Sequence, residues 1–121
     1  MTDDIKSLLI DAAKAAGIEI DKSTTNGGGR GNTGFDLLGN AVLDWHNYTV
    51  WNPATDDGDS ARLRTTMGIN VKWYADEVMV FVPTPLTFEE RFSDHSGDKN
   101  AALRWATLRL AAEIGRRMKD D

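Results

Sequence analysis

NAALRWATLRLAAEIGRRM, residues 100–118, carries the clearest structural pattern in the chain. Apolar side chains recur there at helical spacing and form one stripe, which further leucine and isoleucine residues widen. Ser96 or Asp98 can cap the start of this helix, because a short side-chain oxygen accepts a free backbone N–H of the first turn. We therefore expect a long amphipathic helix, with Trp105 largely buried against a sheet. The stripe consists of Ala101, Trp105, Leu108, Ala112 and Gly115.

Two further helices are expected upstream of this one. Apolar residues at helical spacing predict a helix over residues 3–16, and the glycine that follows suits a left-handed cap at its end. A second helix is expected over residues 56–67, where Thr55 or Asp56 can act as the N-terminal cap. A glycine directly follows this stretch as well.

The predicted strands lie between the helices. Residues 78–82, VMVFV, are continuously apolar, as expected for an inner strand covered on both faces. Alternation over residues 69–74 predicts a half-buried strand with Trp73 on its core face, and residues 88–92 suit a short edge strand. Residues 35–51 fit a helix or strands, and their strand-forming end favours strands. The element order predicts an α/β (α+β) fold.

Composition narrows the class of protein. A chain of 121 residues suits a single domain over 1–121. Its net charge of −5 opposes broad attraction to the nucleic-acid backbone, so we do not expect direct DNA binding. Because cysteine is absent, disulfide scaffolds, thiol catalysis and cysteine-ligated zinc are excluded. No apolar run approaches the roughly 20 residues that span a bilayer, and the acidic start is unlike a signal peptide. We therefore expect a cytoplasmic protein without membrane contact.

Three phrases occur in an order that resembles a known family. They are LLIDAAKAAGIEI at 8–20, WNPATDDGDSARLRTTMGI at 51–69, and the C-terminal stretch at 100–118. Together they resemble small bacteriophage and prophage proteins of the phage ABA-sandwich type, a family without an agreed activity; residues 51–59 are the most specific part. The resemblance implies a phage origin and a three-layer sandwich, with a small central sheet that carries helices on both faces. The chain departs from the family at 22–45, where its glycine-rich loop is longer.

The glycine-rich segment at 22–34 is expected to be a flexible loop, since it is polar and lacks hydrophobic periodicity. Within it, residues 27–32 can also wrap an anion. Small residues let backbone N–H groups approach a phosphate, and Arg30 can bind it in a bidentate manner. The Lys-Ser/Thr ending of a Walker loop is missing, so a plain loop, a phosphate contact and a protein contact all stay open.

Aromatic residues surround the loop region that follows. Trp45, Tyr48 and Trp51 can stack on a base or anchor a protein partner if they are exposed. The sequence therefore predicts a ligand site that combines these aromatics with the small residues and the arginine of the preceding loop. The candidate ligand-binding residues are Gly28, Gly29, Arg30, Asn32, Trp45, Tyr48 and Trp51.

A cluster of acidic residues is compatible with a metal-binding site, since carboxylates bind hard cations. Three aspartates lie close together in the sequence: Asp56, Asp57 and Asp59. No glutamate follows them at the distance that a calcium-binding loop requires. A helix N-terminus explains the same acids through capping and the helix dipole, and we favour that reading. No metal ligand is therefore assigned.

Two histidines and several arginines complete the candidates. His46 lies near Asp44, and His95 lies near Asp94 and Asp98, so each could pair with an acid for general acid–base chemistry. Adjacency in sequence is a weak criterion because catalytic groups assemble in space, and exposed loop histidines are the favoured reading. The arginines of the last two helices are expected on solvated faces; they are Arg62, Arg64, Arg104 and Arg109.

No nucleophile, metal-ligand set or phosphate motif is complete, so the sequence favours binding over catalysis, with no catalytic residue and no cofactor assigned. We expect a small phage-encoded accessory protein that acts in the host bacterial cytoplasm. A counter-defence role would have it sequester a nucleotide-type host signal or occupy a host protein. The alternative is a small hydrolase that uses His46 or His95 with a neighbouring aspartate. A structural role in the virion is a third hypothesis. The chain can also form a homo-oligomer, and this alternative stays open.

Overall fold

The computed structural model describes residues 5–18, 20, 34–35, 40–44, 49–83 and 85–118. These residues form a mixed α+β structure, which confirms the predicted class. Within these ranges no helix is long and apolar enough to cross a membrane. The elements are α1 (Ile5–Ala16), β1 (Gly34–Phe35), β2 (Ala41–Asp44), β3 (Thr49–Trp51), α2 (Asp57–Met67), β4 (Asn70–Trp73), β5 (Glu77–Val82), β6 (Leu86–Arg91), the 3-10 turn η1 (Phe92–His95) and α3 (Lys99–Arg117).

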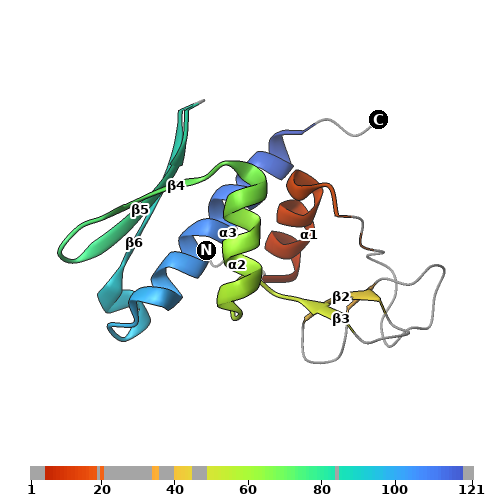
Figure 1. Cartoon of the computed structure of the whole chain (residues 1–121), viewed down its shortest axis with the longest axis horizontal. Helices are drawn as coiled ribbons and strands as arrows, with labels where there is room; N and C mark the ends of the chain where they lie inside the picture. The colour runs from red at the N-terminus through yellow and green to blue at the C-terminus, as the bar shows by residue number, and fades with distance from the viewer. Residues whose placement is uncertain are drawn as a thin grey trace.

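The long helix α3 lies in the middle of the molecule (Figure 1). It packs against α1 on one side and against β5 and β6 on another. Its side chains enter two apolar clusters, one with α1 and one with β5. Asp98 caps its start, since the carboxylate accepts the backbone N–H of Ala101 at 3.0 Å, as predicted. The α3 residues of the first cluster are Leu108, Ala111 and Ala112, and those of the second are Ala102, Ala106 and Leu110.

The strands within the described ranges form two antiparallel sheets of three strands each, β1-β2-β3 and β4-β5-β6. A single central sheet between helical layers was expected, and the observed arrangement differs because a helix takes the central place. α3 is apolar on two faces, so it can cover the β4-β6 sheet and still bury a second face against α1. Strands within residues 35–51 were favoured over a helix, and β2 and β3 confirm this where the structure describes them.

β5 is the inner strand of its sheet, as predicted for residues 78–82. Only one of its faces is fully covered, however. Val78, Val80 and Val82 are buried, whereas Met79 and Phe81 alternate with them and are half-buried. The expected cover on both faces is therefore wrong for the face away from α3. This pattern is what an antiparallel sheet with a single helical layer produces.

Two tryptophans lie differently from the prediction. Trp73 was expected to pack on a core face. Its register with Val78 does place it on the face that α3 covers, with its ring centre 6.1 Å from that of Phe92, but it is 49% exposed because β4 is an edge strand among the described strands. Trp105 was expected to be largely buried by a sheet; it is half-buried and packs against the cluster that α1 and α3 share. α3 is thus rotated so that Leu110, rather than Trp105, faces the β4-β6 sheet.

The two glycine caps are confirmed. Gly17 and Gly68 have φ of 77° and 68°, and the isoleucine after each donates its backbone N–H back into the preceding helix. Ile18 reaches the carbonyl of Ala13 at 2.8 Å, which is the hydrogen bond of a Schellman motif. The loop expected at 22–34 lies outside the described residues except for Gly34, which belongs to β1 and so corrects the loop boundary.

At Gly115 the backbones of α1 and α3 approach each other closely. A Cβ added at Gly115 would lie 1.7 Å from the carbonyl oxygen of Asp11. We expect Gly115→Ala to destabilise the chain by about 2 kcal/mol or more, because the helix backbones must separate and this outweighs the gain of about 1 kcal/mol in helix propensity. Urea denaturation measures the change. Gly58→Ala is the control, since its added Cβ would meet only side-chain atoms at 3.2 Å and beyond; equal stability of the two variants would contradict this contact.

Glu77 and Glu89 lie on the outer face of the β4-β6 sheet and give a testable pH dependence. A hydrogen bond with the side chain of Glu89, together with desolvation and the charge of Glu89, raises the pKa of Glu77. The folded chain therefore binds this proton more tightly than the unfolded chain. The resulting stabilisation is complete below the unfolded-state pKa and is lost as pH rises through the folded-state pKa.

We expect Glu89→Gln to lower the pKa of Glu77 and to flatten this part of the stability profile. Carboxyl-carbon NMR titration measures the pKa, and urea denaturation between about pH 4 and pH 7 measures the stability. Asp94→Asn is the control, because it removes an exposed carboxylate elsewhere. A Glu77 titration that is the same in Glu89→Gln and in the parent chain would refute the coupling.

Candidate functional site

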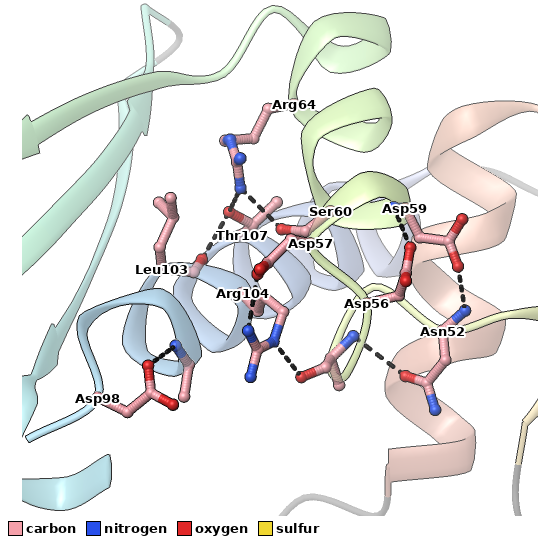
Figure 2. Close-up of polar contacts among 12 residues, drawn as sticks. Asn52, Asp56, Asp57, Asp59, Ser60, Arg64, Asp98, Leu103, Arg104 and Thr107 are labelled. Carbon is pink, nitrogen blue, oxygen red and sulfur yellow. Dashed lines mark hydrogen bonds and ion pairs between the residues drawn. The ribbon is translucent and has the colours of Figure 1, made fainter. Parts of the chain in front are cut away.

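Asn52 organises the turn between β3 and α2. Its side-chain oxygen accepts the backbone N–H of Ala54 at 3.0 Å (Figure 2). Its carbonyl accepts the N–H groups of Thr55 and Asp56 at 3.1 and 2.9 Å. Asparagine is suited to this place because its side chain mimics a backbone turn. The turn therefore directs the chain from β3 straight into the start of α2.

The three acids of this segment all have structural partners. Asp56 caps α2 by accepting the N–H of Asp59 at 2.8 Å, and Asp57 pairs with Arg104 at 2.7 Å. Asp59 is buried, and it accepts the backbone N–H of Asn52 at 2.9 Å and a guanidinium N–H of Arg62 at 2.6 Å. The capping interpretation is confirmed for Asp56. Within the described residues no three potential ligands come together to hold a metal ion.

Two arginines join this turn and α2 to α3. Arg104 donates to the carbonyl of Ala54 at 2.9 Å, and Arg64 donates to the hydroxyls of Ser60 and Thr107 at 2.7 and 3.1 Å (Figure 2). Burial lowers the pKa of Arg64, while the charge of Asp57 acts in the opposite direction. The expectation of solvated faces is therefore wrong for Arg64 and Arg104. Both guanidinium groups lie between elements because α2 and α3 pack side by side.

A pocket of about 400 Å³ lies where the end of α1, the β2-β3 pair and α2 meet. Its floor is mostly apolar, with two threonine hydroxyls and the Asp59–Arg62 ion pair. The Arg62 side chain is 71% exposed, so it lies at the solvent side of the pocket and keeps donors that Asp59 does not use. The lining residues are Ala16, Ile18, Leu43, Thr49, Val50, Trp51, Asp59, Arg62, Leu63 and Thr66.

Of the candidate ligand-binding residues, Trp51 is the one that the structure describes. It lines the pocket and is otherwise buried, with 5% of its surface exposed. Gly28, Gly29, Arg30, Asn32, Trp45 and Tyr48 lie outside the described residues. The sequence analysis missed Arg62 and Thr66 as pocket residues; the signal was their spacing of four on one helix, which places both on the same face.

His95 makes a buried contact that its sequence neighbours did not indicate. Its Nε2 lies 2.7 Å from Glu90 Oε1, and Arg109 donates to the other Glu90 oxygen at 2.6 Å. The side chains of His95 and Glu90 are 10% and 9% exposed. The expectation of an exposed loop histidine is therefore wrong for His95, and its partner is Glu90 rather than a neighbouring aspartate. Arg109 also lies over the ring of Phe88, 5.3 Å from its centre. His46 lies outside the described residues.

Comparison of the chain with protein-family models, with curated proteins and with solved structures finds no match. The phage-family resemblance of residues 8–20, 51–69 and 100–118 thus stays an expectation. In the structure, residues 51–59 of the middle phrase form one hydrogen-bonded unit that contains the turn, the helix cap and the buried acid.

The buried acid of this unit gives the next prediction. We expect Asp59→Ala to destabilise the chain by about 1–3 kcal/mol, because the N–H of Asn52 loses its acceptor in a buried place. Thermal and urea unfolding measure the loss. Asp94→Ala is the matched control, since it removes an exposed carboxylate. A loss no greater than that of the control would show that the Asn52–Asp59 hydrogen bond does not hold the turn.

Proposed function

We propose that the chain is a binding protein, and that the pocket between α1, the β2-β3 pair and α2 takes a small planar molecule with an anionic group. The pocket carries this proposal. Trp51 and Leu63 provide an apolar floor for a ring, and Thr49 and Thr66 provide hydroxyls that can select its polar edge. Arg62 at the solvent side suits a phosphate or carboxylate, because a guanidinium binds such groups through paired hydrogen bonds.

Catalysis is less well supported at this pocket. Asp59 is its carboxylate, and that side chain already accepts two hydrogen bonds from the protein itself, so it acts as a structural acceptor. A general base must be free to take a proton from a bound molecule. The chemistry of the pocket therefore supports retention of a ligand, as expected for a protein that sequesters a small signal.

A nucleotide-type ligand combines the ring and the anion that this pocket suits. Together with the resemblance to phage proteins, this supports a phage-encoded accessory protein that acts against host defence in the bacterial cytoplasm by sequestering a nucleotide signal. Occupation of a host protein is the other form of this proposal, and it predicts a bound protein rather than a released small molecule.

A small hydrolase is the second candidate, and one observation favours it. The Glu90 carboxylate contacts His95 Nε2, and a carboxylate that orients a histidine is a recurring part of acid–base sites. The pair is nearly buried and Arg109 also binds Glu90, so a structural role explains the same contacts. Loss of turnover in His95→Gln, with the fold retained, would favour the hydrolase.

The binding proposal is tested by heating the purified chain and identifying any released small molecule by mass spectrometry. Calorimetric titration with nucleoside monophosphates and cyclic dinucleotides then measures affinity. We expect Arg62→Gln to weaken binding about tenfold, because a charge-assisted contact contributes about 1.4 kcal/mol. Its effect on unfolding should be small, since the Arg62 side chain is largely exposed.

Arg116→Gln is the matched control for this change. Arg116 is also an exposed arginine paired to an acid three residues away, but it lies on α3 and outside the pocket. It should leave affinity unchanged. Release of an intact ligand supports sequestration; equal affinities of the two variants, or a ligand converted to product, would overturn the proposal.

A further inference from the structure

The outer face of the β4-β6 sheet is open to solvent, and its centre is apolar. α3 covers the inner face, and Figure 1 shows the sheet at the edge of the molecule, with none of the described helices on its other side. The outward positions of the inner strand β5 include Met79 and Phe81, both half-buried by their neighbours only. An antiparallel sheet with one wet face usually places polar residues at such positions. Two adjacent apolar positions on an uncovered face suit a contact with another surface.

Charges flank this apolar centre in a fixed pattern. Met79 is paired in register with Lys72 on β4 and with Glu89 on β6, so one row across the face is basic, apolar and acidic. Directly opposed residues point to the same side of a sheet, so all three lie on the outer face. Lys72 and Glu89 are two strands apart, roughly 9–10 Å, and are not direct neighbours within one chain.

We propose that this face binds a second copy of the chain, with a two-fold axis parallel to β5 between the stacked sheets. Such an axis lays β4 of one copy over β6 of the other. Lys72 of each copy then faces Glu89 of the other copy, and Met79 faces Met79. The row of Lys72, Met79 and Glu89 is self-complementary, which is the condition for a two-fold interface. Stacked sheets with aligned strands are a common arrangement.

The flanking row at Phe81 agrees with this orientation, whereas the row at Glu77 places the Glu77 carboxylates of the two copies opposite each other, which weakens the association. Asn70 and Thr87 are opposed to Phe81 from the two edge strands, so an uncharged polar residue of one copy meets the same kind of residue in the other. Edge-to-edge pairing is a less suitable mode of association. The edge strand β6 carries Glu89 and Arg91, and charged side chains on an edge oppose the addition of a further strand.

The size of the face predicts a weak dimer. Three strands of four to six residues cover about 14 by 18 Å, well below the roughly 800 Å² that each partner buries in a standard stable interface. The dissociation constant should therefore lie in the range of about 10 μM to 1 mM. The pocket lies on the other side of α3, so association and ligand binding are separable.

Sedimentation velocity on the full chain, from about 10 μM to about 1 mM, tests the proposal. The mean mass of the parent chain should rise with concentration toward that of a dimer. Met79→Lys should abolish the rise. Lys72→Glu should weaken association about tenfold, because the two-fold repeats the broken charge pair. The double change Lys72→Glu with Glu89→Lys should restore association, since the opposed charges are only exchanged.

Lys99→Glu is the control for net charge, because it makes the same change in charge on α3 and should leave association intact. Circular dichroism verifies that each variant is folded. A parent chain that stays monomeric at about 1 mM would overturn the proposal. So would a dimer that persists in Met79→Lys, or one that Lys72→Glu weakens and the double change does not restore. Ligand affinity measured in Met79→Lys tests the pocket separately.

Discussion

α3 carries two apolar faces, and each face is completed by a different partner. Leu108, Ala111 and Ala112 bury against α1, while Ala102 and Ala106 bury against the β4-β6 sheet. The small residues allow close approach, and at Gly115 the backbones of the two helices nearly touch. Because protein interiors are densely filled, this single contact constrains the position of α1 relative to everything that α3 supports.

Polar contacts then orient the remaining elements around α3. Arg104 binds both the carbonyl of Ala54 and the carboxylate of Asp57, so it holds the turn after β3 and the start of α2 together. Arg64 reaches across to Thr107 from the other end of the same interface. These charged groups are partly buried, and they are stable there because each has hydrogen-bonding partners. The walls of the pocket are consequently connected to the same central helix as the β4-β6 sheet.

The candidate sites lie on opposite sides of this central helix. On one side, the pocket is assembled from the end of α1, the β2-β3 pair and α2. On the other side, β5 presents Met79 and Phe81 on a face that none of the described helices covers. The Glu90–His95–Arg109 group connects β6, η1 and α3 through the two contacts of the Glu90 carboxylate. α3 thus separates the pocket from the outer face of the β4-β6 sheet, so ligand binding at one and association at the other can occur independently.

Elements whose signals act over a few residues could be predicted from the amino-acid sequence. Asp56 and Asp98 cap helices, and Gly17 ends one, because those groups bond to backbone atoms within five residues of themselves. The apolar run of β5 likewise predicted an inner strand. Which face packs against which partner depended on contacts between distant elements. Trp105 packs against the cluster of α1 and α3, Trp73 is 49% exposed on an edge strand, and His95 contacts Glu90. Periodicity records that a face is apolar, but the choice of its partner depends on how distant elements fill space together, as the contact of Gly115 with Asp11 illustrates.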